Sequence, residues 1–178
     1  MKLNNKLKQI LSWLLVVIWC IIIFLFSAMD SDNSNNKSIK TIEKVVETTV
    51  NTTSDLGITE KVSDHKINEI SYNLNFPLRK CVHAFVYLIL AILVLNALKQ
   101  SGVKGYKIYF IGLLICFIYS IFDEYHQTFV MGRTGQFMDS LIDTGGSILG
   151  TLIYFIFKKL KKVKKSTKYD IIRVINYL

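Results

Sequence analysis

The chain alternates between long apolar segments and polar ones. Apolar segments cover residues 10–29, 81–98, 106–123 and 137–157. Each is close to the length of about 20 residues that an α-helix needs to cross a bilayer. Ser27-Ala28 resembles a signal-peptide cleavage site, but the preceding apolar run is long for a signal peptide and three more apolar segments follow it. The pattern predicts an all-α integral membrane bundle of four transmembrane helices.

One large polar insertion, residues 30–80, separates the first span from the second. Its apolar residues at helical spacing predict an amphipathic helix: Ile39, Ile42, Val45, Val46 and Val50. We expect this helix to break at residues 52–57 and a second short helix to cover residues 67–74. Pro77 then falls in the first turn of the second span, where its missing N–H is no loss. We expect the insertion outside the membrane. Its helices either lie on the outer membrane face, dock on the bundle, or form a solvated helical hairpin.

The distribution of charge predicts the orientation of the bundle. The 178 residues include 22 Lys and Arg and 13 Asp and Glu, with a formal charge of +9 and a mean hydropathy of +0.36. Of those 22 basic residues, 14 lie in residues 1–9, 99–107 and 158–178. Short basic segments stay in the cytoplasm, so we expect both termini there. The basic excess then indicates topology, and we expect no nucleic-acid partner.

Ionisable residues, together with Gln127, concentrate where three of the spans approach the outer surface. They start the second span, end the third, occupy the next turn and start the fourth: Arg79, Lys80, His83, Asp123, Glu124, His126, Gln127, Arg133, Asp139 and Asp143. With four antiparallel spans, all of these positions fall at one level of the membrane. Ionisable residues at such depth are costly and indicate a functional site.

Helical spacing predicts which faces carry these residues. Arg79, His83 and Tyr87 are each four apart and share one face of the second span. A stripe of small and polar residues marks the third span: Gly112, Cys116, Ser120, Asp123 and Gln127. Another marks the fourth: Asp139, Asp143, Gly146 and Gly150. Small residues allow helix backbones to approach closely, so we expect both stripes to face the bundle.

The chemistry of this cluster is open to three interpretations. In the first, Arg79 and Arg133 each bind a phosphate in bidentate fashion. The carboxylates of Asp123, Asp139 and Asp143 orient these arginines, and His83 or His126 moves a proton. Alternatively, Asp123, His126 and Asp143 ligate a divalent cation that bridges to phosphate. In the third interpretation, pairs such as Arg79–Asp143 only fix helix register. Glu124, Lys80 and Tyr125 are expected to be surface groups.

The order of short motifs resembles the VanZ-like family of small bacterial membrane proteins, named after an accessory factor in teicoplanin resistance. The motifs are Phe26-Ser27, R-K-x-x-H at 79–83, D-E-x-H-Q at 123–127, Gly132-Arg133 and D-x-x-x-D-x-x-G at 139–146. The resemblance covers residues 10–157. Family members commonly have a P-G-R turn, whereas this chain has Met131 in place of the proline. The resemblance implies a multi-pass protein of the bacterial plasma membrane with a role in the cell envelope.

Together, these patterns predict a protein that binds or modifies a lipid headgroup or a cell-wall precursor, and the family resemblance implies an effect on glycopeptide susceptibility. We expect His83, Asp123, His126 and Asp143 in catalytic roles. We expect Arg79, Gln127, Arg133 and Asp139 in ligand binding. The alternatives are a non-catalytic accessory or scaffold protein and a metal-dependent hydrolase or transferase acting on a lipid-linked phosphate. A homo-oligomer formed through a glycine stripe is compatible with the sequence, which identifies no cofactor.

Overall fold

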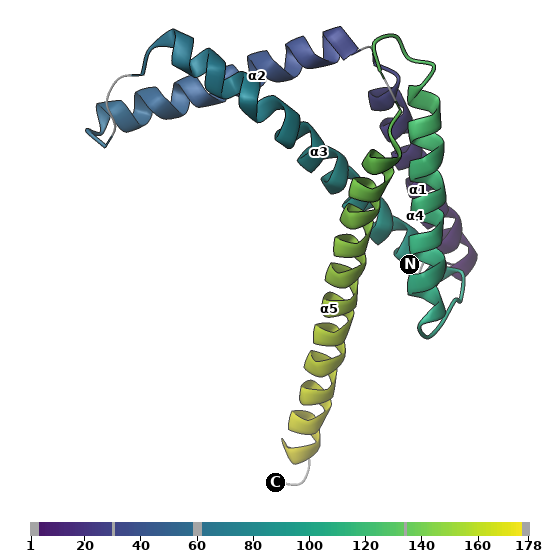
Figure 1. The fold of residues 1–178 in the computed structure, drawn as a ribbon. Helices are drawn as coiled ribbons and strands as arrows, with labels where there is room; N and C mark the ends of the chain where they lie inside the picture. Colours follow the sequence, from purple (N-terminus) through teal and green to yellow (C-terminus); the bar gives the residue numbers. More distant parts are fainter. Residues whose placement is uncertain (1–3, 30, 59–61, 134, 176–178) are drawn as a thin grey trace.

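A computed structural model describes residues 4–29, 31–58, 62–133 and 135–175, and the side chains of these except for residues 31–34 and 162–175. The first three residues and the last three of the predicted cytoplasmic ends lie outside it. The helices are α1 (Asn5–Ser27), α2 (Ser31–Asp55), α3 (Asp64–Gln100), α4 (Lys107–Gln127) and α5 (Phe137–Ile175) (Figure 1). Four of them, all except α2, are long and apolar enough to span a membrane. The prediction of an all-α, four-span membrane protein is confirmed.

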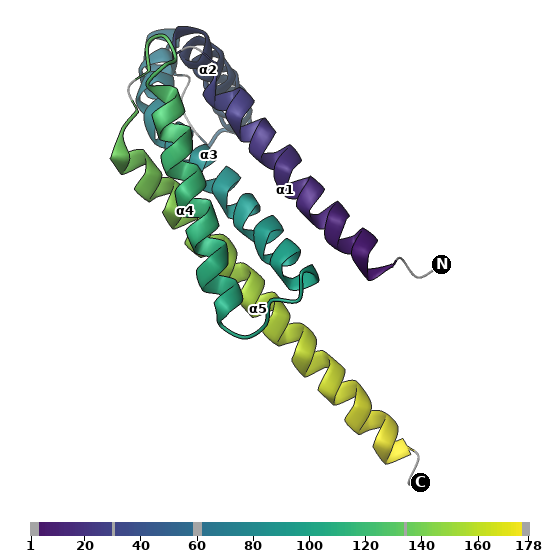
Figure 2. The same ribbon diagram turned by 90° about the vertical axis from the view of Figure 1, so that its right-hand side faces the viewer.

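Helix α3 is the centre of the bundle. It contacts every other helix and carries most of the fully buried apolar residues, among them Tyr87, Leu90, Val94 and Leu95. Figure 2 shows α1, α4 and α5 arranged around its second half. Trp19 Nε1 on α1 donates a hydrogen bond to the carbonyl oxygen of Val86 at 3.0 Å. The outward faces remain apolar and exposed, as expected of helices that contact lipid.

The expected boundary at Pro77 is wrong. Helix α3 runs without interruption from Asp64 to Gln100, so Pro77 lies in its interior and the two predicted helices are one. A proline here removes only the hydrogen bond to the carbonyl of Asn73, and the flanking turns remain paired within a long helix. The first half of α3 lies alongside α2 (Figure 1). Helix α2 ends at Asp55, within the predicted break at residues 52–57, and Gly57 with a φ of 71° follows it.

Helices α3 and α5 pack backbone to backbone. A Cβ atom built on Gly146 would lie 1.9 Å from the carbonyl oxygen of Ala84, and one on Gly150 would lie 2.3 Å from that of Leu88. Ser147 Oγ donates to the carbonyl of Tyr87 at 3.4 Å. The predicted stripe on the fourth span therefore faces α3 of the same chain. Helix α5 itself continues beyond residue 157, where the fourth span was expected to end, as far as Ile175.

The turn between α4 and α5 closes the end of the bundle opposite the N-terminal end of α1 (Figure 2). Arg133 N donates to the carbonyl oxygen of Val130 at 3.1 Å, and Gly132 has a φ of 74°. These features define a type II turn, in which the position of Met131 is the one that proline favours. The absence of proline therefore leaves the turn intact. We call this end, which includes Ser27, Arg79, Asp123 and Asp139, the polar end.

Candidate functional site

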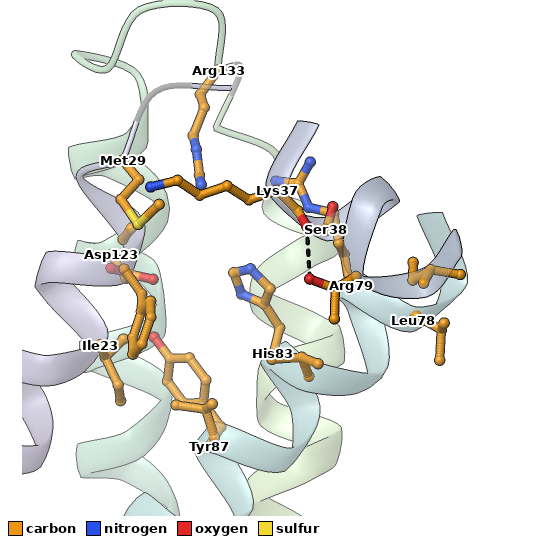
Figure 3. Close-up of a pocket in the computed structure, with 16 residues that line it drawn as sticks. Ile23, Met29, Lys37, Ser38, Leu78, Arg79, His83, Tyr87, Asp123 and Arg133 are labelled. Atoms are coloured by element: carbon orange, nitrogen blue, oxygen red, sulfur yellow. Dashed lines mark hydrogen bonds between the residues drawn. The ribbon is translucent and has the colours of Figure 1, made fainter. Parts of the chain in front are cut away.

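Helix α3 supplies one wall of the site. Arg79, His83 and Tyr87 share a face, as the four-residue spacing predicts, and all three line a single cavity at the polar end (Figure 3). Tyr87 is fully buried, whereas the side chain of His83 is 32% exposed. The polar character of this wall therefore increases from the interior of the bundle towards its polar end.

Three carboxylates from α4 and α5 meet inside the bundle. One oxygen atom from each of Asp123, Glu124 and Asp143 lies within 4.8 Å of the other two. All three residues are buried, with 1%, 5% and 0% of their surfaces exposed. The expectation that Glu124 is a surface group is thus wrong. Its carboxylate accepts hydrogen bonds from Gln127 Nε2 at 3.2 Å and from the backbone N–H of Gln136 at 2.9 Å.

The two aspartates of this group lack the hydrogen bonds that buried carboxylates normally have. No described residue donates a hydrogen bond to either oxygen of Asp143. Among the described side chains, the basic group nearest to Asp143 is the His83 imidazole, whose Nδ1 lies 3.8 Å from Oδ1. Ser27 and Gln127 lie beside Asp123, but neither reaches hydrogen-bond geometry with it. Internal pairing therefore does not account for these two acids.

Asp139, unlike Asp123 and Asp143, forms an ion pair with a lysine. Lys80 Nζ forms a salt bridge with Asp139 Oδ1, and both side chains are partly exposed. Arg79 donates from Nη1 to Asn35 Oδ1 rather than to Asp143. The expected Arg79–Asp143 pair is therefore not formed. Lys80, expected to be a surface group, is half-buried, whereas Tyr125 is 63% exposed, as expected.

Helix α2 contributes polar residues that are not among the predicted site residues. Ser38 Oγ donates to Asn75 Oδ1 at 2.5 Å, and Asn75 Nδ2 donates to Asn35 Oδ1 at 3.5 Å. Lys37 lines the same cavity as Arg79 and His83 (Figure 3). The start of the insertion, residues 31–38, is rich in Asn and Ser. The composition of that segment was the signal, because amides and hydroxyls on a helix can bond to a second helix.

His126 and Gln127 have different surroundings. The His126 ring packs on Phe24 of α1, with ring centroids 4.2 Å apart. The group of side chains whose ligand atoms lie within 4.8 Å of one another does not include His126. Gln127 is buried and holds Glu124 in place. Among the predicted metal ligands, the structure therefore groups Asp123 and Asp143 with Glu124 and not with His126.

Two adjoining cavities complete the site. The first, of about 690 Å³, is walled mainly by apolar residues of α1 and α3 such as Ile23, Phe26 and Val82. The second, of about 360 Å³, is lined mainly by polar residues of α2, α3, α5 and the α4–α5 turn. Arg79, His83 and Arg133 line both cavities. Cavities of this size are typical of small-molecule sites, and this pair offers apolar and polar space side by side.

The fold and the site define a multi-pass helical membrane protein with a charged pocket at one end of its bundle. The chain belongs to the VanZ/LLP1 family, whose model matches residues 12–158. This match confirms the resemblance derived from the motifs. Comparisons with curated proteins and with solved structures give no match.

Proposed function

We propose that this VanZ/LLP1 protein binds an anionic amphiphile, a lipid or lipid-linked cell-wall precursor, at the outer surface of the bacterial plasma membrane. The observation that carries the proposal is the pair of adjoining cavities that share Arg79, His83 and Arg133. An acyl or prenyl chain suits the apolar cavity, and a phosphate-bearing headgroup suits the polar one. A ligand with only one of these parts would leave the other cavity unused.

Basic side chains favour an anionic headgroup. Lys37, Arg79 and Arg133 all line the apolar cavity, on the side that faces the polar end of the bundle. Guanidinium groups bind phosphate through two parallel hydrogen bonds. Arg79 is already oriented by Asn35, which lowers the entropy lost when it binds a ligand. His83 lines both cavities with the two arginines and lies 3.8 Å from Asp143, so it is placed to exchange a proton with such a headgroup.

The basic segments support an outward orientation of the polar end. The loop at 99–107 and the basic tail of α5 lie away from the α4–α5 turn (Figure 2). If these segments are cytoplasmic, the polar end faces outwards, where cell-wall precursors are used. By binding such a precursor there, the protein would change susceptibility to glycopeptides such as teicoplanin.

Lipid retention by the purified protein tests this function. Native mass spectrometry of the full chain in detergent would compare phosphatidylglycerol with zwitterionic phosphatidylcholine. We expect preferential retention of phosphatidylglycerol, reduced about tenfold in Arg79→Ala and Arg133→Ala, since each loses a charge-assisted contact of roughly 1.5 kcal/mol. Lys66→Ala, which removes an exposed cation of the same helix α3, serves as the control. Equal retention of both lipids by all four proteins would contradict the proposal.

A further inference from the structure

The geometry points to a divalent-cation site formed by Asp123, Glu124 and Asp143. One oxygen from each carboxylate lies within 4.8 Å of the other two. Oxygen atoms bound to one Mg²⁺, Mn²⁺ or Ca²⁺ are about 3 to 5 Å apart, from adjacent to opposite positions, because metal–oxygen distances are about 2.0 to 2.6 Å. The three oxygens therefore already have the spacing of a coordination sphere.

The protein holds the third ligand in a defined position. Gln127 and the backbone N–H of Gln136 both donate to the Glu124 carboxylate. A Cβ atom on Gly135 would lie 2.2 Å from the carbonyl oxygen of Glu124, so the residues after the turn pack directly on this part of α4. Hydrogen bonds of this kind around a ligating carboxylate orient it towards the metal.

Unpartnered oxygens around the acids are a separate observation. Ser27 Oγ and Tyr87 Oη have no hydrogen-bond partner among the described residues, although the two residues are only 2% and 0% exposed. Both line the cavity that Asp123 lines, and the Tyr87 hydroxyl points towards Asp123 (Figure 3). These hydroxyls, like the unpartnered carboxylate oxygens of Asp123 and Asp143, can accept a cation or its bound water. A donor set made only of oxygen favours Mg²⁺, Mn²⁺ or Ca²⁺ over softer metals.

Charge balance favours the same conclusion. Three neighbouring carboxylates repel one another, and the repulsion is strong where water is excluded. Lys80 is engaged by Asp139, and the closest basic atom to Asp143 among the described side chains is His83 Nδ1 at 3.8 Å. Arg133 acts electrostatically on Asp123, and a divalent cation would offset the remaining negative charge of the three carboxylates. If the proposed function holds, the cation also attracts the phosphate of a bound headgroup, and this consequence alone depends on that function.

Mn²⁺ binding tests the site without any lipid. The full-length protein in detergent would be stripped with a chelator and titrated with MnCl₂, with free Mn²⁺ measured by electron paramagnetic resonance. We expect one Mn²⁺ per chain in the wild type, displaced by excess Mg²⁺ or Ca²⁺. Asp143→Asn and Glu124→Gln should each bind at least tenfold more weakly. Gly135→Ala should also weaken binding while every ligand is retained, because the added Cβ displaces Glu124.

Glu69→Gln is the matched control, since it removes an exposed carboxylate of helix α3 that lies outside the three-carboxylate group. It should bind Mn²⁺ like the wild type, and circular dichroism should show that each variant remains helical. If Asp143→Asn does not fold, Glu124→Gln carries the test. The site is refuted if the wild type binds no Mn²⁺ up to millimolar concentration, or if all variants bind it equally. Mn²⁺ binding without any effect on phosphatidylglycerol retention would support the site and reject only its link to the lipid.

Discussion

The two ends of the helical bundle treat their polar side chains differently. At the end opposite the polar end, Ser101 Oγ accepts hydrogen bonds from Trp13 Nε1 at 2.9 Å and Gln9 Nε2 at 3.3 Å, and itself donates to Ala97. Nearby, Asn96 Nδ2 donates to Ser12 Oγ at 3.4 Å. At the polar end, buried oxygens of Ser27, Tyr87, Asp123 and Asp143 have no such partner.

Polar groups with partners hold helices together, whereas buried polar groups without partners are available to bind a ligand. In an apolar environment, an unsatisfied polar group costs several times what a made hydrogen bond gains. Such a cost persists in a fold mainly where function requires it. Of these residues at the polar end, Ser27, Tyr87 and Asp123 line one cavity, and Asp143 lies beside His83, which lines the same cavity. The end of the bundle that contains Ser101, which we call the paired end, is therefore expected to contribute stability. The polar end is expected to contribute binding at the expense of stability.

The largest expected effect comes from separating α5 from α3. In Gly146→Ala the new Cβ would lie 1.9 Å from the Ala84 carbonyl oxygen, so the helices must move apart and carry Asp143 with them. Overpacking of this kind costs about 3 kcal/mol or more, measured as the loss of thermal stability in detergent. Gly145→Ala is the matched control, because its Cβ would meet nothing within 4 Å. Comparable losses in the two variants would mean that the close approach of the helices is not what stabilises the bundle.

The next effect has the opposite sign. In chelator, Asp143→Asn should raise the unfolding free energy by about 1 to 3 kcal/mol, since an amide costs less to bury than an unpartnered carboxylate. The same variant should lose Mn²⁺ binding. Unfolding followed by tryptophan fluorescence, with and without MnCl₂, measures both effects. A clear destabilisation in chelator would show that Asp143 is satisfied within the bundle, and the contrast between the two ends would disappear.

The paired end should respond in the ordinary way. Ser101→Ala removes the acceptor of Trp13 and Gln9 and should lower the unfolding free energy by about 1 kcal/mol. Its retention of phosphatidylglycerol should match that of the wild type. Ser63→Ala provides the control, because the Ser63 side chain at the start of α3 makes no capping hydrogen bond. Reduced lipid retention by Ser101→Ala would mean that the two ends are coupled.

Much of the architecture could be predicted from periodicity alone. The four spans, the shared face of Arg79, His83 and Tyr87, and the inward stripes on α4 and α5 all follow from helical spacing and are confirmed. The boundary at Pro77 could not be predicted in this way. Proline favours the first turn of a helix locally, but contacts between α2 and α3 keep the helix continuous across it.

The composition of the site was predicted better than its pairing. Spacing places Asp123 and Asp143 on inward faces, but which neighbour joins them depends on the position of the α4–α5 turn. Residues 135–136 pack over Glu124 and bury it, while His126 turns towards Phe24. Similarly, Asn35 accepts a hydrogen bond from Arg79. This contact between α2 and α3 is not specified by any local sequence pattern.

The smallest effect concerns the one carboxylate–ammonium pair at the polar end among the described residues. The Lys80 and Asp139 side chains are 24% and 21% exposed, and pairs open to solvent contribute about 0 to 1 kcal/mol. Lys80→Ala and Asp139→Asn should therefore each lower the unfolding free energy by less than about 1 kcal/mol, and the double variant by no more than either alone. A double-mutant cycle in detergent, repeated at high salt, measures the coupling. A coupling well above 1 kcal/mol that salt does not weaken would show that the pair is desolvated like the buried acids beside it. Lys80 would then belong to the dry interior of the site and not to its rim.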